Sequence, residues 1–315
     1  MRQDLAFLFP GQGSQRVGML AQAAEEFPEV AAVFEESSEA LGFDLSALIL
    51  NGDPEQLNLT EFTQPALLAS SVALWRSWVA RGGVTPSAMA GHSLGEFSAL
   101  CCAGALSLGD AVTLVRERGR FMQTAVPVGV GSMAAILGLD DEVVSQTCAQ
   151  VSADNEGVVE AVNFNAPGQV VIAGNCAAVD TAIAALKDAG AKRAMPLPVS
   201  APFHTSLMVP AGEQLAEVLA DITIEAPQIP VVHNVHAQTE GEPERIRELL
   251  VRQISAPVRW TACISKLQSM GAVQFAECGA GNVLGGLLRR IDRGAACAYF
   301  EKPEDLKAAV LALGA

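Results

Sequence analysis

The stretch Ala88-Met89-Ala90-Gly91-His92-Ser93-Leu94-Gly95 decides the fold of this chain. Its first four residues form a short apolar run, as expected for a buried strand, and a helical pattern follows from Leu94 to about Ala105. The serine lies in the pattern G-x-S-x-G, in which a strained strand-to-helix turn projects a nucleophilic hydroxyl. Side chains at the two glycine positions would clash with the neighbouring strand and helix. The stretch therefore predicts a catalytic Ser93, and a plain strand–helix turn is the alternative.

Strands and helices alternate on both sides of this stretch. Before it, the apolar run Leu5–Phe9 is expected to be a strand that leads into a glycine-rich loop, and residues 18–80 are largely helical by periodicity. Pro65 favours a new helix start at Thr63, because proline is well tolerated at a helix entry. Later strands are expected at 231–235, 273–277 and 296–300, with helices around 245–254 and 283–291. This order predicts an α/β sheet built from both chain ends.

The middle of the chain has a different rhythm. Strands are expected at 133–139, 158–164, 169–173 and 193–199, and helices at 141–151 and 179–189. The order β-α-β-β-α-β is that of the ferredoxin-like unit. The sequence therefore predicts a large α/β domain made of residues 1–128 and 200–315, and a small α+β subdomain inserted at residues 129–199.

Composition disfavours several classes of protein. Hydrophobic residues make up 50% of the chain, charged residues 17%, and the net charge is −15, which is a globular profile and the wrong sign for nucleic-acid binding. No apolar run reaches the roughly 18 residues of a membrane-spanning helix, and the N-terminus has the pattern of a strand instead of a signal peptide. The seven cysteines have no metal-ligand spacing. We therefore expect reduced thiols, no metal and a cytoplasmic location.

A nucleophilic serine needs a base, and the chain has four histidines: His92, His204, His233 and His236. The side chain of His92 should point away from its neighbour Ser93. The histidines at 233 and 236 end a predicted strand, where either could belong to the core or to the surface. His204 lies in a loop where the inserted segment returns to the large domain, and such a junction suits a general base. His204 is therefore the leading candidate, with the other histidines left open.

The helix after Ser93 also has a chemical consequence. The main-chain N–H of Leu94 is expected to point at the oxyanion that develops when the serine attacks a carbonyl group, and the positive end of the helix supports it. A second helix, expected at 110–124, carries Arg116, Arg118 and Arg120. These arginines are either part of a patch that docks an acidic partner or scattered solvated charges.

Several segments are specific in combination: Phe9-Pro10-Gly11-Gln12-Gly13-Ser14-Gln15, the serine turn with Glu96-Phe97-Ser98-Ala99, Arg118-Gly119-Arg120-Phe121-Met122-Gln123, Val162-Asn163-Phe164-Asn165-Ala166-Pro167-Gly168-Gln169, and Pro202-Phe203-His204. In this order they resemble the malonyl-CoA:acyl-carrier-protein transacylase family, from about residue 4 to residue 300. The resemblance implies an α/β-hydrolase-like parallel-sheet domain with a ferredoxin-like insertion.

The resemblance implies roles for individual residues. Ser93 matches the family's nucleophile, and His204 matches its base. Gln253 matches the position whose main-chain carbonyl orients the histidine, so that no triad acid is required. Gln12 matches the residue whose main-chain N–H completes the oxyanion hole with that of Leu94.

Two further positions bear on the substrate. Arg118 matches the arginine that binds the malonyl carboxylate, and a planar guanidinium can do so through two hydrogen bonds. Phe203 precedes the histidine and resembles the aromatic residue of malonyl-selecting modules, where its bulk disfavours a branched acyl group.

The activity implied by the resemblance is transfer of a malonyl group from malonyl-CoA to the phosphopantetheine thiol of acyl carrier protein, through a malonyl-serine ester, for fatty-acid elongation. The expected partners are these two substrates, with no cofactor, no nucleic acid and no membrane, and the chain is expected to be a monomer. A malonyl transferase of a polyketide or malonate decarboxylase system would use the same chemistry with another carrier. A serine thioesterase or other hydrolase shares the serine turn, and a non-enzymatic binding module is the third class.

Overall fold

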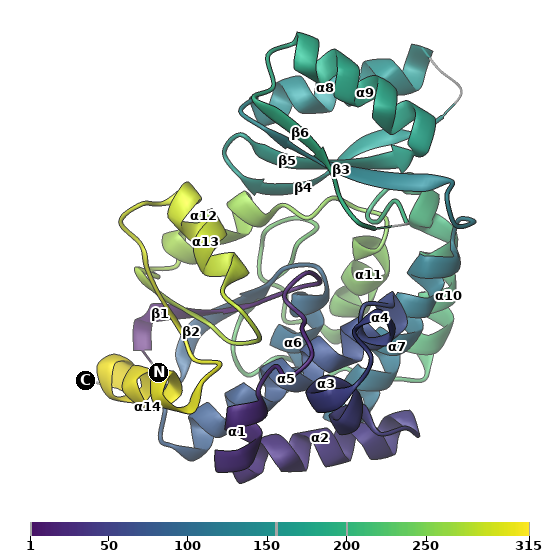
Figure 1. Cartoon of the computed structure of the whole chain (residues 1–315). Helices are drawn as coiled ribbons and strands as arrows, with labels where there is room; N and C mark the ends of the chain where they lie inside the picture. Colours follow the sequence, from purple (N-terminus) through teal and green to yellow (C-terminus); the bar gives the residue numbers. More distant parts are fainter. Residues whose placement is uncertain (1, 155–156, 200, 315) are drawn as a thin grey trace.

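The computed structural model describes residues 2–154, 157–199 and 201–314, and it contains two β-sheets (Figure 1). The larger sheet has five strands in the order β7-β2-β1-β8-β9, and every neighbouring pair is parallel. Its strands are β1 (Arg2–Phe9), β2 (Pro86–Gly91), β7 (Val231–Val232), β8 (Gln274–Glu277) and β9 (Ala296–Tyr299). Both ends of the chain therefore build one parallel sheet, which confirms the predicted α/β class.

Strand β1 lies at the centre of this sheet and is buried on both faces. Leu5, Phe7 and Phe9 belong to one apolar cluster, whereas Ala6 and Leu8 belong to another. Successive side chains of a strand point to opposite faces, so both faces of the sheet must be covered. This double burial explains why β1 is a continuous apolar run instead of an alternating one.

Helices cover both faces. The first cluster contains side chains of α2 (Pro28–Leu41), α5 (Thr60–Ala80) and α7 (Leu108–Thr124), and the second contains side chains of α12 (Trp260–Ser269) and α13 (Val283–Ile291). Further helices of the large domain are α1 (Ala21–Glu26), α3 (Leu45–Asn51), α4 (Pro54–Leu57), α6 (Leu94–Cys102), α10 (Val209–Ala220), α11 (Pro243–Gln253) and α14 (Pro303–Gly314), with a 3-10 turn at Ser206–Met208.

Helix α5 begins earlier than the sequence pattern indicated. It starts at Thr60, so Pro65 lies inside the helix and the predicted start at Thr63 is wrong. The proline ring removes one main-chain hydrogen bond. The helix continues through it because most of α5 is buried against α2 and α7, and tertiary packing contributes more to helix stability than a single bond.

The second sheet is antiparallel and is formed by a continuous part of the chain. Its four strands lie in the order β4-β5-β3-β6, and helices α8 and α9 cover one face (Figure 1). The elements are β3 (Gly131–Leu137), α8 (Asp141–Asp154), β4 (Val159–Ala166), β5 (Gln169–Asn175), α9 (Cys176–Asp188) and β6 (Arg193–Pro196). The strand order and the helices on one face are those of a ferredoxin-like unit. The exact residue limits of the insertion stay a prediction, and its predicted edge at residue 200 lies outside the described residues.

The other face of this small sheet packs on the large domain. Met133, Val162 and Val171 join the main apolar cluster instead of the small unit's own core. A main-chain hydrogen bond runs from the Phe164 N–H to the Val258 carbonyl at 3.0 Å, and another runs from the Val258 N–H to the Val162 carbonyl at 2.8 Å. The small unit is therefore fixed above the carboxyl ends of β1 and β2, where the serine turn lies.

We expect Gly95→Ala to disturb the packing of α6 against the end of β1. A Cβ at position 95 would lie 2.0 Å from the Phe9 carbonyl oxygen, so either β1 or α6 would have to move. Overpacking of this kind costs about 1–3 kcal/mol, which should appear as a lower midpoint in thermal unfolding.

The matched control is Gly286→Ala in α13, where an added Cβ meets no neighbouring group within 4 Å. Alanine is the better helix former, so this variant should be as stable as the parent or slightly more stable. Equal unfolding midpoints for the two variants would contradict the tight approach of β1 to α6.

Candidate active site

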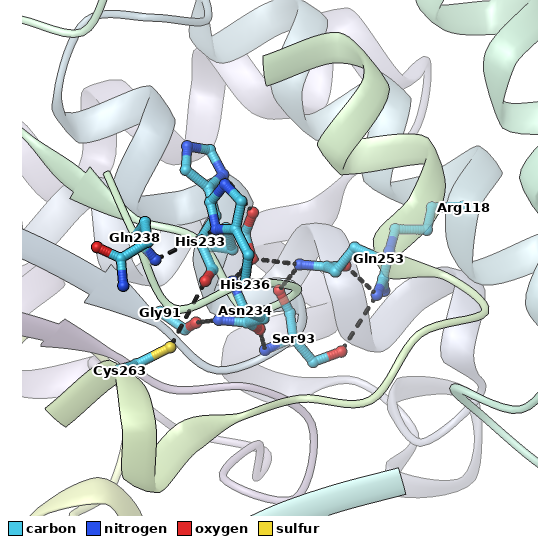
Figure 2. Close-up of polar contacts among 10 residues, drawn as sticks. Gly91, Ser93, Arg118, His233, Asn234, His236, Gln238, Gln253 and Cys263 are labelled. Carbon is cyan, nitrogen blue, oxygen red and sulfur yellow. Dashed lines mark hydrogen bonds and ion pairs between the residues drawn. The ribbon is translucent and has the colours of Figure 1, made fainter. Parts of the chain in front are cut away.

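Ser93 lies in the turn between β2 and α6, and its backbone is strained. Its φ is 52° and its ψ is −108°, a combination that residues other than glycine rarely adopt. The side chain of Asn234 bridges the turn: Oδ1 accepts the Ser93 N–H at 2.7 Å, and Nδ2 donates to the Gly91 carbonyl at 2.7 Å (Figure 2). Strain of this size persists only where the surroundings enforce it, and such sites are often functional.

His204 faces Ser93 from the loop that follows β6. Its Nε2 lies 2.7 Å from the Ser93 Oγ, and its Nδ1 donates to the main-chain carbonyl of Gln253 at 2.9 Å. A carbonyl oxygen can only accept, so the hydrogen of the neutral ring is on Nδ1 and the lone pair on Nε2 faces the hydroxyl. The structure thus brings together three groups that the sequence analysis selected from distant segments.

The other histidines have different partners in the described part of the chain. His92 Nε2 pairs with the Asn165 Oδ1 at 2.8 Å, and His233 Nδ1 pairs with the Glu96 carboxylate at 2.7 Å. His236 packs its ring at 6.0 Å from that of His233. The alternatives for the base that the sequence left open are therefore not supported by the geometry.

Burial gives the site a neutral base beside a cation. His204 is 4% exposed, and loss of solvation followed by the charge of Arg118 lowers its pKa from 6.5 to about 3. Burial also lowers the pKa of Arg118 to about 10, although the Glu96 carboxylate opposes this shift. At neutral pH, His204 can therefore accept a proton while Arg118 remains positively charged.

Arg118 is buried without an ion-pair partner in the described chain. It is 1% exposed, and its hydrogen bonds go to neutral oxygens. Nη1 donates to the Gln64 Oε1 at 2.9 Å. Nη2 donates to the Gln253 Oε1 at 2.9 Å and to the Ser93 Oγ at 3.1 Å (Figure 2). The Glu96 carboxylate acts on this buried cation only from behind Gln253, so the arrangement favours a bound anion next to the hydroxyl.

A cavity of about 500 Å³ opens over these groups, between the large domain and the inserted sheet. Ser93, Arg118 and His204 lie in its wall. The other lining side chains and backbone come from both units: Gln12, Gly13, Gln15, Asn58, His92, Met122, Met133, Asn163, Leu197, Pro198, Val199 and Phe203. A second cavity of about 850 Å³, between α8 and α12, contains none of the three central residues.

The two predicted oxyanion donors, Gln12 and Leu94, belong to segments that meet at the serine turn. Gly11 approaches the serine turn so closely that an added Cβ would lie 2.5 Å from the His92 carbonyl oxygen, which places Gln12 beside the turn. Leu94 is the first residue of α6. Within the described residues, neither the Gln12 nor the Leu94 N–H has a hydrogen-bond acceptor, so both are available to a ligand.

Sequence reasoning missed two residues that hold the site. Gln64 orients Arg118, but the sequence analysis considered this position only as part of a helix start. Asn234 clamps the serine turn, and its position between two histidines gave no signal of that role. Both contacts join segments far apart in the chain, so local patterns could not reveal them.

A metal centre is not evident in the part of the chain that is described. No three side chains among its histidines, cysteines, aspartates and glutamates lie together as a metal-binding group. The polar groups around Ser93 are instead amides, a guanidinium and an imidazole, which suit acyl chemistry at a serine.

Comparisons with known proteins agree with this chemistry. A family model described as the acyl transferase domain matches residues 6–286. The chain is 53% identical over 307 residues to the malonyl CoA-acyl carrier protein transacylase of Salmonella typhimurium, covering 98% of this chain and 99% of the relative. The solved structure of the transacylase of that name from Coxiella burnetii has a TM-score of 0.97 and 45% identity, covering 99% of this chain and 98% of the other.

A further similar structure is a complex. It contains a malonyl-transacylase bound to a holo acyl-carrier protein of a type II polyketide synthase, and its match to this chain has a TM-score of 0.96 with 50% identity. The match covers 98% of this chain and 99% of that one.

The buried imidazole predicts an unusual pH dependence for the reactivity of Ser93. Labelling by a fluorophosphonate requires unprotonated His204, and burial keeps it unprotonated well below 6.5. The second-order labelling rate should therefore stay constant through neutral and mildly acidic pH and fall only as the pH approaches about 3. Circular dichroism at each pH reports whether the protein is still folded. A rate that is half-maximal near pH 6.5 in folded protein would contradict the burial of the ring.

Proposed function

Because this chain belongs to the malonyl CoA-acyl carrier protein transacylase family, we propose that it moves a malonyl group from malonyl-CoA to the phosphopantetheine thiol of acyl carrier protein by way of a malonyl ester on Ser93. One observation supports this most directly. The Ser93 Oγ is in contact with both the His204 Nε2, at 2.7 Å, and the Arg118 Nη2, at 3.1 Å. A base and an anion site thus converge on one hydroxyl.

The first half-reaction forms the ester. The Ser93 Oγ attacks the thioester carbonyl while its proton passes to the His204 Nε2, which the Gln253 carbonyl holds in the correct tautomer. The negative charge on the former carbonyl oxygen is stabilised by the N–H groups of Gln12 and Leu94, and one such donor contributes about 3 kcal/mol. When the tetrahedral intermediate collapses, the C–S bond breaks and the coenzyme A thiolate takes the proton from His204.

The second half-reaction is the first in reverse with another thiol. His204 accepts the proton of the phosphopantetheine thiol, and the resulting thiolate attacks the ester carbonyl. The C–O bond to Ser93 breaks, and the serine oxygen recovers its proton from His204. The kinetics are therefore of the ping-pong type, with coenzyme A leaving before the carrier protein reacts.

Arg118 gives the site its preference for a dicarboxylic acyl group. A malonyl carboxylate can accept hydrogen bonds from the guanidinium next to the Ser93 Oγ, and two parallel bonds to an anion are stronger than bonds to neutral oxygens. Phe203 and Met122 add bulk to the cavity wall and are proposed to disfavour a branched acyl chain.

The physiological context extends this proposal. Fatty-acid synthesis is the pathway we propose, because relatives that match the whole chain are transacylases of acyl carrier protein. The similar polyketide complex favours a polyketide carrier as the second candidate, and a malonate decarboxylase carrier is a third. The absence of a cofactor, the monomeric state and the cytoplasmic location stay predictions. None of the described helices has the length and apolar character needed to cross a membrane.

Incubation with radiolabelled malonyl-CoA tests the proposed intermediate. The protein should take up one malonyl group on Ser93 and pass it to purified acyl carrier protein, and Ser93→Ala should take up none, because no other nucleophile faces the base. Intact-protein mass spectrometry locates the ester. Rapid release of free malonate without a carrier would support a hydrolase instead, and a malonyl adduct on Ser93→Ala protein would refute the assignment.

Replacing Arg118 with alanine should change the acyl preference. Malonyl transfer should fall by about 100-fold or more, because two charge-assisted hydrogen bonds are lost, while acetyl transfer should persist or rise. The measurement is kcat/KM for malonyl-CoA and for acetyl-CoA with the same carrier protein. Unchanged malonyl transfer would show that the arginine does not bind the carboxylate.

A further inference from the structure

We propose that Glu96 is a positioning residue for acyl transfer, because its carboxylate fixes the two side chains, Gln253 and Asn234, that hold the reacting groups in place. This inference rests on the proposed function. In the described part of the chain, the carboxylate of Glu96 makes no hydrogen bond to the Ser93 Oγ, His204 or Arg118. It acts one layer behind them.

The carboxylate of Glu96 is buried and fully hydrogen-bonded. It lies in the first turn of α6, three residues after Ser93, and is 0% exposed. Its Oε1 accepts from the His233 Nδ1 at 2.7 Å, and its Oε2 accepts from the Asn234 N–H at 2.9 Å and from the Gln253 Nε2 at 2.8 Å. A carboxylate is retained in a protein interior only with such partners, so these donors and Glu96 fix one another.

The contact with Gln253 sets the direction of an amide. One Nε2 hydrogen goes to Glu96, and the other goes to the Ser93 carbonyl at 3.0 Å. The Oε1 must then face the Arg118 Nη2, which it accepts at 2.9 Å (Figure 2). The main-chain carbonyl of the same residue accepts the His204 Nδ1 at 2.9 Å. Glu96 therefore orients, through one residue, both the anion site and the base.

The contact with Asn234 supports the strained turn. Glu96 fixes the main-chain N–H of Asn234, whose side chain then bonds the Ser93 N–H and the Gly91 carbonyl (Figure 2). Ser93 has a φ of 52°, which needs support from its surroundings. Because α6 carries both Ser93 at its start and Glu96 one turn later, the helix couples the serine turn to the groups that face it.

The geometry indicates that the length of the side chain at position 96 matters more than its charge. Glutamine has the same length, so its Oε1 can accept from Asn234 and Gln253, and its Nε2 can donate to the His233 Nδ1. That last bond requires the His233 hydrogen to move to Nε2, which has no partner in the described structure. Aspartate keeps the charge but is shorter by one C–C bond, about 1.5 Å, so it loses at least one of the three donors.

The test compares Glu96→Gln with Glu96→Asp. The rate of malonyl-serine formation should stay within about tenfold of the parent in the glutamine variant, since the three hydrogen bonds keep their geometry and only their charge-assisted strength is reduced. In the aspartate variant it should fall about 100-fold, because a shift of about 1 Å in positioning groups can cost that much. The loss should be larger with malonyl-CoA than with acetyl-CoA, since acetyl transfer does not use Arg118.

Ser98→Ala is the matched control. Ser98 is buried on the same helix, and its hydroxyl has no partner in the described part of the chain, so the variant should react like the parent. Thermal unfolding of all variants separates loss of stability from loss of rate. The positioning role would be overturned if the Glu96→Asp variant formed the malonyl ester as fast as the Glu96→Gln variant or faster. It would also be overturned if the rate fell equally with malonyl-CoA and acetyl-CoA, or if both variants reacted at the rate of the parent.

Labelling of Ser93 with a fluorophosphonate keeps the two proposals apart. This labelling depends on His204 and the serine turn but not on malonyl-CoA. We therefore expect the same order of labelling rates, fastest in the parent, slower in Glu96→Gln and slowest in Glu96→Asp. If the parent were labelled but never formed a malonyl ester, the proposed function would fail while the role of Glu96 would still be judged by this order. If the parent protein transferred malonyl groups as proposed and the Glu96→Asp variant were labelled as fast as the parent, only the role of Glu96 would fail.

Discussion

The close approach of β1 to the start of α6 is the constraint on which the rest of the site depends. Gly95 leaves no room for a side chain against the Phe9 carbonyl, and Gly91 leaves none against the main chain at Gly95. This contact forces the chain to turn sharply at Ser93, with a positive φ that no stable helix or strand would allow. The sharp turn directs the Ser93 hydroxyl into the cavity, and the hydrogen bonds of Asn234 hold the backbone of the turn in place.

The inserted sheet turns this exposed hydroxyl into an enclosed site. It packs one face on the large domain and adds a wall to the cavity, and the chain that returns from it carries His204. His204 also has a positive φ, of 65°, so both members of the pair are held in conformations that the surrounding structure must enforce. A hydroxyl and an imidazole that are already 2.7 Å apart need little reorganisation before proton transfer.

Exclusion of water explains the electrostatic character of the site. Burial lowers the pKa of His204, so that the ring is neutral and can act as a base, and it leaves Arg118 as a cation whose partners are neutral oxygens. We propose that the carboxylate of a malonyl group pairs with this cation. Burial is the largest cause of the low pKa of His204, and the charge of the same guanidinium lowers it further.

The sequence by itself determined the features that short segments encode. The glycines around Ser93 report a local steric limit, the apolar run at β1 reports burial on both faces, and the order of strands and helices from 131 to 196 reports the small antiparallel unit. It also indicated His204, by its place in the loop after the insertion, and Gln253 and Arg118, through resemblance. The predicted helix start at Thr63 was wrong, because the burial that keeps α5 helical through Pro65 is not visible in the local sequence.

Only the tertiary structure decided how these segments meet. Ser93 and His204 are 111 residues apart in the chain, and Gln253 is 160 residues from the serine whose carbonyl it binds. Gln64, Asn234 and Glu96 act through contacts of the same kind, and their neighbouring residues do not reveal these partners. The physical reason is that backbone conformation depends on nearby residues, whereas burial, hydrogen-bond partners and pKa values depend on whatever the fold packs alongside.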